Sequence, residues 1–111
     1  MDYFEKKLKD EKNIYFHREV VYSSREGRKM EMFTVSSMDG IMDERETVPK
    51  KKGENMKGLF PDSVKNPKSR PYRFNQDKKV IIFTSRVHPG ETPGSHILNG
   101  ALDIITDPKS E

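Results

Sequence analysis

The chain of 111 residues contains no cysteine. It can therefore form neither a disulfide framework nor a thiolate metal site, so any metal ion must be held by histidine and carboxylate ligands. The absence of cysteine is also compatible with a reducing compartment.

Long apolar runs are missing as well. Residues 1–13 lack the apolar core of a secretory signal peptide. No run in the chain approaches the roughly 20 apolar residues that a membrane span needs. We therefore expect a cytoplasmic protein that does not bind a membrane.

The chain is poor in hydrophobic residues and in net charge. Hydrophobic residues make up 32% of the sequence, and the seven glycines do not close the gap to the roughly 45–50% of an ordinary soluble domain. The core is therefore expected to be thin. Charged residues reach 35%, yet the net charge is only +3, so the chain lacks the overall field of a nucleic-acid-binding protein. Nucleic acid is not an expected partner.

Positive charge is concentrated in residues 48–74. This segment has a net charge of +6, which leaves −3 for the rest of the chain. It also holds four prolines and almost no periodicity, so we interpret it as a basic loop or insertion. It is either a solvated loop or a surface that attracts an acidic partner. Its basic residues are Lys50, Lys51, Lys52, Lys57, Lys65, Lys68, Arg70 and Arg73.

Hydrophobic patterning predicts an α/β fold with a mixed sheet and flanking helices. Asp2 can cap a short helix that ends near Lys12, with Glu5 three positions after the cap. Two runs rich in β-branched and aromatic residues, Ile14–Ser23 and Lys29–Ser37, predict a hairpin.

The last third of the chain predicts a strand, a loop and a helix. Residues 79–85 have a continuous apolar centre, which is typical of a strand covered on both faces in the middle of a sheet. After a turn at Pro89 and Gly90, we expect Ser95 to cap a helix with apolar residues at helical spacing. That helix should pack one face on the sheet.

His88 and Glu91 lie in the predicted loop between this strand and this helix. Loops at the carboxyl ends of strands are where α/β sheets bind ligands, and zinc accepts imidazole and carboxylate. Because Pro89 and Gly90 impose a tight turn, the two side chains can converge on one ion. The alternative is a loop pair that only forms a hydrogen bond.

The other polar candidates receive no metal-binding role. His17 is expected to be a half-exposed strand residue, and His96 to be exposed in the first turn of the final helix. Arg86 either attracts an acidic substrate or forms an ordinary ion pair.

Several segments, in order along the chain, carry a family resemblance: MFTVSSMDG, ERE, GLFPD, RPYRF and VIIFTSRVHPGETP, followed by NGALDII. From about Ile14 to Asp107 they resemble the zinc-site region of the cytosolic carboxypeptidases, a branch of the metallocarboxypeptidases. The part between Val48 and Lys57 resembles an insertion. Gly94 departs from the serine that the family pattern favours.

The resemblance implies that residues 1–111 are the front portion of a zinc carboxypeptidase domain. The implied enzyme removes glutamate from polyglutamylated or carboxyl-terminal tails of tubulin and similar proteins. One zinc ion (Zn2+) per complete domain would be held by His88, Glu91 and a later histidine, and would activate a water molecule.

In this family the third ligand, the catalytic glutamate and the residues that grip the substrate all come from later sequence. We therefore expect no catalytic residue here, and an inactive chain when it is isolated. It would be a fragment, a truncated isoform or a partial gene model. The alternative function is a catalytically inactive product that at most binds acidic partners through its basic loop.

Overall fold

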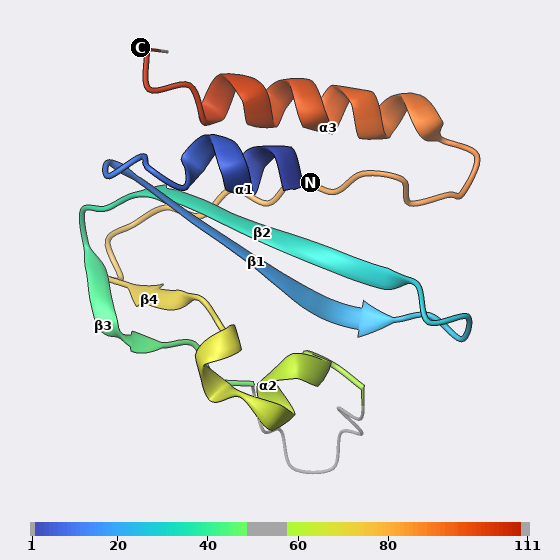
Figure 1. Ribbon diagram of the computed structural model, residues 1–111, viewed down its shortest axis with the longest axis horizontal. Helices are drawn as coiled ribbons and strands as arrows, with labels where there is room; N and C mark the ends of the chain where they lie inside the picture. Colours follow the sequence, from blue (N-terminus) through green and yellow to red (C-terminus); the bar gives the residue numbers. More distant parts are fainter. Residues whose placement is uncertain (1, 49–57, 110–111) are drawn as a thin grey trace.

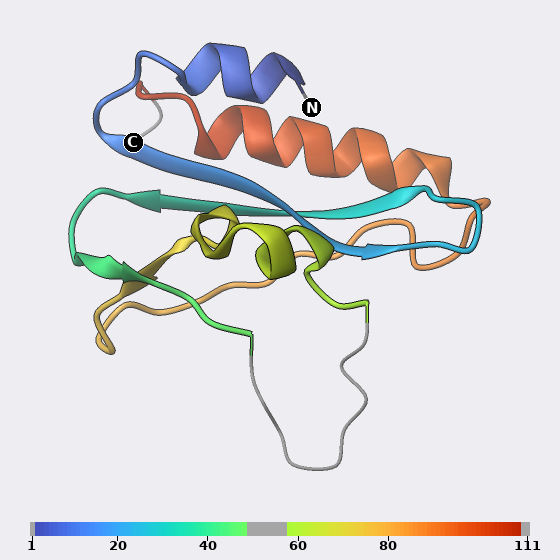
Figure 2. The same cartoon turned by 60° about the horizontal axis from the view of Figure 1, so that its bottom comes forward.

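The computed structural model describes residues 2–48 and 58–109. These residues form a mixed α/β structure with two small antiparallel sheets, which confirms the predicted class (Figure 1). Helices α1 and α3 lie on one side of the β1–β2 hairpin, and α2 with the second sheet lies on the other (Figures 1 and 2). The elements are α1 (Asp2–Leu8), β1 (Ile14–Ser23), β2 (Lys29–Ser37), β3 (Ile41–Arg45), α2 (Pro61–Lys65), a 3-10 turn (Pro67–Ser69), β4 (Tyr72–Phe74) and α3 (Thr92–Ile105).

The predicted hairpin is confirmed at the predicted bounds. Strands β1 and β2 pair antiparallel from Ile14 opposite Ser37 to Ser23 opposite Lys29. The connection turns at Gly27, whose φ of 75° lies in the left-handed region that glycine adopts without steric cost. A local register shift between Val20 and Tyr22 increases the twist of β1.

The second sheet was not predicted, and residues 58–74, part of the segment interpreted as a basic loop or insertion, contain regular elements. Strand β3 pairs antiparallel with β4, and residues 58–74 also contain α2 and the 3-10 turn. Pro61 begins α2, where its fixed φ and missing N–H are tolerated. The basic residues Lys50, Lys51, Lys52 and Lys57 lie outside the described residues.

One face of β1 binds the chain segment that leads into β4. Tyr15, His17 and Glu19 share this face because side chains two residues apart in a strand point the same way. The backbone N–H of Tyr72 donates to the Tyr15 hydroxyl at 2.9 Å, and Nε2 of His17 donates to the carbonyl of Ser69 at 2.8 Å. His17 is thus a half-buried strand residue with a structural contact, close to its expected environment.

Glu19 makes the third contact from this face, a buried ion pair with Arg70. Their side chains are only 4% and 9% exposed. The Arg70 guanidinium also lies 3.7 Å from the ring centroid of Phe60, an arrangement that adds cation–π attraction. The carbonyl of Arg70 accepts a hydrogen bond of 2.6 Å from Arg45, so this residue links β1 to β3.

The opposite face of β1 holds helix α1. Arg18 contacts Glu31 on β2 at 2.7 Å and reaches Asp2 and Glu5 of α1 at 3.0 and 3.2 Å. The helix ends at Leu8 rather than near Lys12. Residues 9–13 carry no apolar side chain, and a helix this short needs an apolar contact to persist.

Residues 79–85 do not form the predicted central strand. Val80, Ile81 and Ile82 are 80%, 77% and 80% exposed. A strand is stable only when neighbouring strands satisfy its backbone and cover its faces. Among the described residues the sheets are β1–β2 and β3–β4, so this apolar run has no strand beside it there.

Helix α3 begins at Thr92, three residues before the predicted cap at Ser95. It buries Leu102, while Ile97 and Ile104 are 73% and 67% exposed. Part of the apolar face that was expected to pack on a sheet is therefore exposed. Within the described ranges, no helix is long and apolar enough to cross a membrane.

Helices α1 and α3 lie side by side in both views (Figures 1 and 2). Lys7 of α1 donates to the backbone carbonyl of Asp103 at 3.2 Å and to the hydroxyl of Thr106 at 3.2 Å. Thr106 is fully buried. This polar tether connects the carboxyl end of α3 to the amino-terminal helix.

The thin core that composition predicted is confirmed. The buried hydrophobic residues in the described ranges are Phe4, Leu8, Val20 and Leu102. The accessible surface of the chain is 9369 Å², whereas a compact folded monomer of this mass exposes roughly 6,300 Å². Buried polar contacts must therefore hold much of this structure together.

Substitution of Arg70 tests the buried ion pair. We expect Arg70→Ala to lower the free energy of unfolding by about 3–5 kcal/mol, because Glu19 would be left as a buried charge without its partner. Urea denaturation followed by circular dichroism measures this loss. The double variant Glu19→Leu/Arg70→Met should recover most of it, and a double variant as unstable as Arg70→Ala would contradict the explanation.

Candidate functional site

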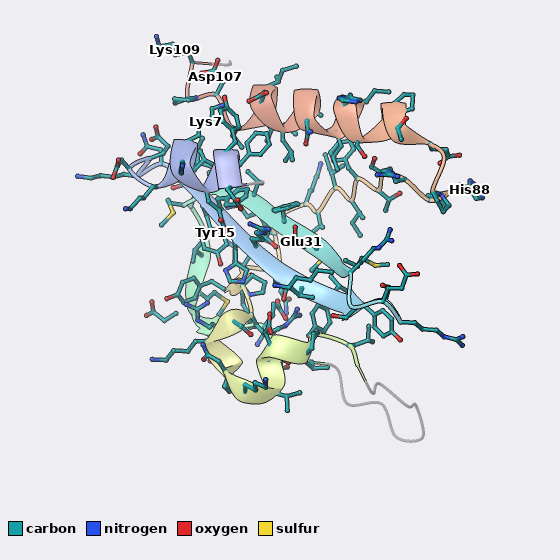
Figure 3. The ribbon with its side chains drawn as sticks, turned by 45° about the vertical axis from the view of Figure 1, so that its right-hand side comes forward. Lys7, Tyr15, Glu31, His88, Asp107 and Lys109 are labelled. Atoms are coloured by element: carbon teal, nitrogen blue, oxygen red, sulfur yellow. The ribbon has the colours of Figure 1, made fainter. Side chains whose placement is uncertain are left out.

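The candidate site is the loop between residues 85 and 92, which connects the exposed apolar run to α3. Figure 3 places His88 at the outer end of this loop, with its side chain pointing away from the rest of the molecule. The side chains of His88 and Glu91 are 76% and 55% exposed. The site is thus open to solvent and to a second molecule.

His88 and Glu91 converge, as the turn between them predicted. Nδ1 of His88 lies 2.9 Å from Oε1 of Glu91, and the His88 backbone N–H donates to Oε2 at 3.3 Å. The turn is closed by the Glu91 N–H, which donates to the His88 carbonyl at 3.1 Å. Because an ionised carboxylate only accepts, the proton of this side-chain hydrogen bond belongs to Nδ1.

These contacts favour the charged form of Glu91. The hydrogen bond from the His88 side chain, followed by the one from its backbone, holds the pKa of the Glu91 carboxyl below its ordinary value. A deprotonated carboxylate is the form that binds a metal ion.

The donor pair fits part of a zinc site. Two ligand atoms about 2.1 Å from one tetrahedral zinc ion lie roughly 3.4 Å apart, and the present separation is 2.9 Å. A small opening and loss of the Nδ1 proton would suffice. In the ranges 2–48 and 58–109, no group of three or more His, Asp or Glu residues could hold a metal ion. These ranges therefore offer half of a tetrahedral shell.

The remaining sequence candidates lie elsewhere or make other contacts. His17 of β1 is hydrogen-bonded to the carbonyl of Ser69 in the 3-10 turn, and His96 is exposed in α3. Because α3 begins at Thr92, His96 lies beyond its first turn. Arg86 donates to the carbonyl of Pro89 at 2.6 Å. This contact was not predicted, since Arg86 was expected either to attract an acidic substrate or to form an ion pair.

Part of the predicted positive charge is used inside the structure. Arg70 is buried against Glu19, and Arg73 lies 3.3 Å from Glu44. The surface that residues 58–74 present to an acidic molecule is therefore less positive than the sequence suggested. Lys65 and Lys68 are exposed there.

Gly94 allows the loop to approach the start of α3. A Cβ atom at this position would lie 3.1 Å from the Ser85 hydroxyl and 3.6 Å from the Arg86 backbone nitrogen. A side chain at residue 94 would require Ser85 to move. Gly94, which stands where the resembled family pattern favours serine, thus lies at a close contact beside the candidate site.

Comparison with known proteins identifies relatives of this chain. No family model matches it. Cytosolic carboxypeptidase-like protein 5 of Rattus norvegicus is 42% identical over 96 residues, which are 86% of this chain and 10% of that protein. The Homo sapiens protein of the same name is 39% identical over 95 residues, again 86% of this chain and 10% of the relative.

This chain is homologous to a segment of the cytosolic carboxypeptidases. It spans about one tenth of the length of these relatives. Cytosolic carboxypeptidase 6 of Homo sapiens is more distant, with 28% identity over 91 residues, 82% of this chain and 12% of the relative. A continuous match that covers 86% of the chain necessarily includes residues 88–91. The candidate loop therefore lies inside the segment shared with the cytosolic carboxypeptidases.

Acidification should open this loop. The pKa of Glu91 is lowered in the folded loop, so the loop closure is fully present above the ordinary glutamate value of about 4.3. It is lost as the pH falls through the depressed pKa. We expect faster exchange of the Glu91 amide proton below that pH, measured by NMR relative to unstructured peptide. Glu91→Gln should show no such step, and an unchanged step in this variant would assign the transition to another group.

Proposed function

We propose that this chain forms part of a zinc metallocarboxypeptidase that removes glutamate from polyglutamylated or carboxyl-terminal tails of tubulin and similar proteins in the cytoplasm. The observation that carries the proposal is the convergence of His88 Nδ1 and Glu91 Oε1 at 2.9 Å. This pair lies in a segment homologous to proteins named as cytosolic carboxypeptidases, which supports peptide hydrolysis at a carboxyl terminus.

His88 and Glu91 would supply two ligands to one zinc ion. When bound, zinc polarises a carbonyl and lowers the pKa of a water molecule to about 7, which provides a nucleophile at neutral pH. The chain's own contribution is to hold both side chains on one turn. No described residue is assigned as the general base or as the group that grips the substrate carboxylate.

An acidic substrate is consistent with the charge distribution. The segment from residue 48 to residue 74 has a net charge of +6, and a positive surface attracts glutamate-rich tails over the roughly 8 Å screening length of physiological buffer. Exposed Lys65 and Lys68 contribute to that attraction, whereas Arg70 is buried and Arg73 is paired with Glu44.

Zinc titration of the chain tests the ligand assignment. We expect weak binding at one ion per chain, because two protein ligands leave half of the shell to water. His88→Ala and Glu91→Ala should each lower the affinity at least about tenfold, a loss that even outer-shell changes can cause. His96→Ala is the matched control, since it removes an exposed histidine from α3. A loss of zinc in His96→Ala would mean that the wrong histidine was chosen.

The reaction is tested in a protein of the relatives' length that contains this chain. His88→Ala and Glu91→Ala should abolish glutamate release from a polyglutamylated peptide, because metal activation of water needs the ion in fixed geometry. Elemental analysis of zinc per chain accompanies the rate. If Glu91→Ala keeps both its zinc and its rate, the assignment is wrong. We expect no glutamate release from the isolated 111-residue chain.

A further inference from the structure

Arg86 adopts a backbone conformation that arginine rarely uses. Its φ is 57°, in the left-handed region where a Cβ atom crowds the following carbonyl oxygen. Such residues persist only when the surrounding structure over-determines them, and they gather at functional loops. Arg86 lies two residues before His88, so the strain occurs at the entrance to the candidate site.

The side chain of Arg86 turns back onto the same loop. Its Nη2 donates to the carbonyl of Pro89 at 2.6 Å. Pro89 is the residue directly after His88, in the turn that the Glu91 N–H closes. A charge-assisted hydrogen bond to this carbonyl resists opening of the turn.

The backbone of Arg86 lies close to the start of α3. Its nitrogen lies 3.6 Å from the position that a Cβ atom of residue 94 would take, and the Ser85 hydroxyl lies at 3.1 Å. Gly94 lacks that atom, which lets residues 85 and 86 lie against the first turn of α3. The guanidinium therefore extends from a backbone that packs closely against this turn.

We propose that Arg86 is a positioning residue of the candidate metal site. Its left-handed backbone directs the guanidinium onto the Pro89 carbonyl and thereby fixes the turn that brings the side chains of His88 and Glu91 together. Arg86 touches neither side chain in this role, since it acts through the backbone between them. The role in metal binding depends on the proposed function, whereas the effect on the loop does not.

A metal-free experiment tests the effect on the loop. Arg86→Gly removes the guanidinium and also relieves the backbone strain, because glycine adopts this φ without steric cost. We expect the amide proton of Glu91 to exchange at least about fivefold faster by NMR, while the midpoint of urea unfolding stays equal or rises. A merely structural role would instead shift protection and unfolding in the same direction.

Two further variants make this result specific. Arg86→Lys retains the charge and a single donor and should restore part of the protection, because the ammonium lacks the rigid geometry of the guanidinium. Arg28→Gly is the matched control, since it removes an exposed arginine of the hairpin connection that pairs with Glu26 at 2.8 Å. Unchanged Glu91 exchange in Arg86→Gly, or equal loss in Arg28→Gly, would overturn the proposal.

Zinc alone then tests the link to the metal site. Arg86→Gly should weaken zinc binding about tenfold, with Arg86→Lys between this variant and the natural chain. If the natural chain binds no zinc through His88, the proposed function fails. The exchange result still shows whether Arg86 holds the turn closed. If Arg86→Gly speeds exchange but leaves zinc affinity unchanged, the positioning role in metal binding is overturned.

Discussion

The buried ion pair between Glu19 and Arg70 is the contact that ties the second sheet and its flanking turns to the hairpin. It joins the hairpin to the residues just before β4. The Arg70 carbonyl also accepts a hydrogen bond from Arg45 of β3. Because the hydrophobic core is thin, this polar interaction holds segments together that apolar packing would hold together in larger domains. Loss of one partner leaves the other as a buried unpaired charge, so the pair disfavours arrangements in which these two segments separate.

Local signals predicted the elements that are stable through local contacts. The runs Ile14–Ser23 and Lys29–Ser37 have strong β propensity and a short connection, and their bounds are confirmed. Strands β3 and β4 were missed because Ile41–Arg45 is mostly polar and Tyr72–Phe74 is very short. Their pairing depends on contacts of Arg45 and Tyr72 with distant residues, which no periodicity in either strand reveals.

The apolar run at residues 80–83 was predicted to be a buried strand. Its composition shows that the segment could be buried, but it does not show whether another strand or helix lies beside it. Its four side chains are between 62% and 80% exposed, which shows that a pattern can predict a buried strand without identifying its neighbours. The candidate site was more predictable, since the turn at Pro89 and Gly90 is a local property. The proposed role of Arg86 could not be predicted from the sequence, because no sequence pattern indicates its left-handed φ or its contact with Pro89.

The exposure of the candidate site explains why the rigidity of its loop matters. With His88 76% exposed, water competes for every polar contact, and the high dielectric weakens attraction between an ion and its ligands. Burial would therefore contribute little to the affinity of the proposed metal site, and the binding free energy would have to come from ligands that already lie near their binding geometry. The Pro89–Gly90 turn and the Arg86 side chain reduce the conformational freedom that binding would otherwise have to remove. If the proposed metal site is correct, preorganisation of this loop takes the place of burial as the main source of its affinity.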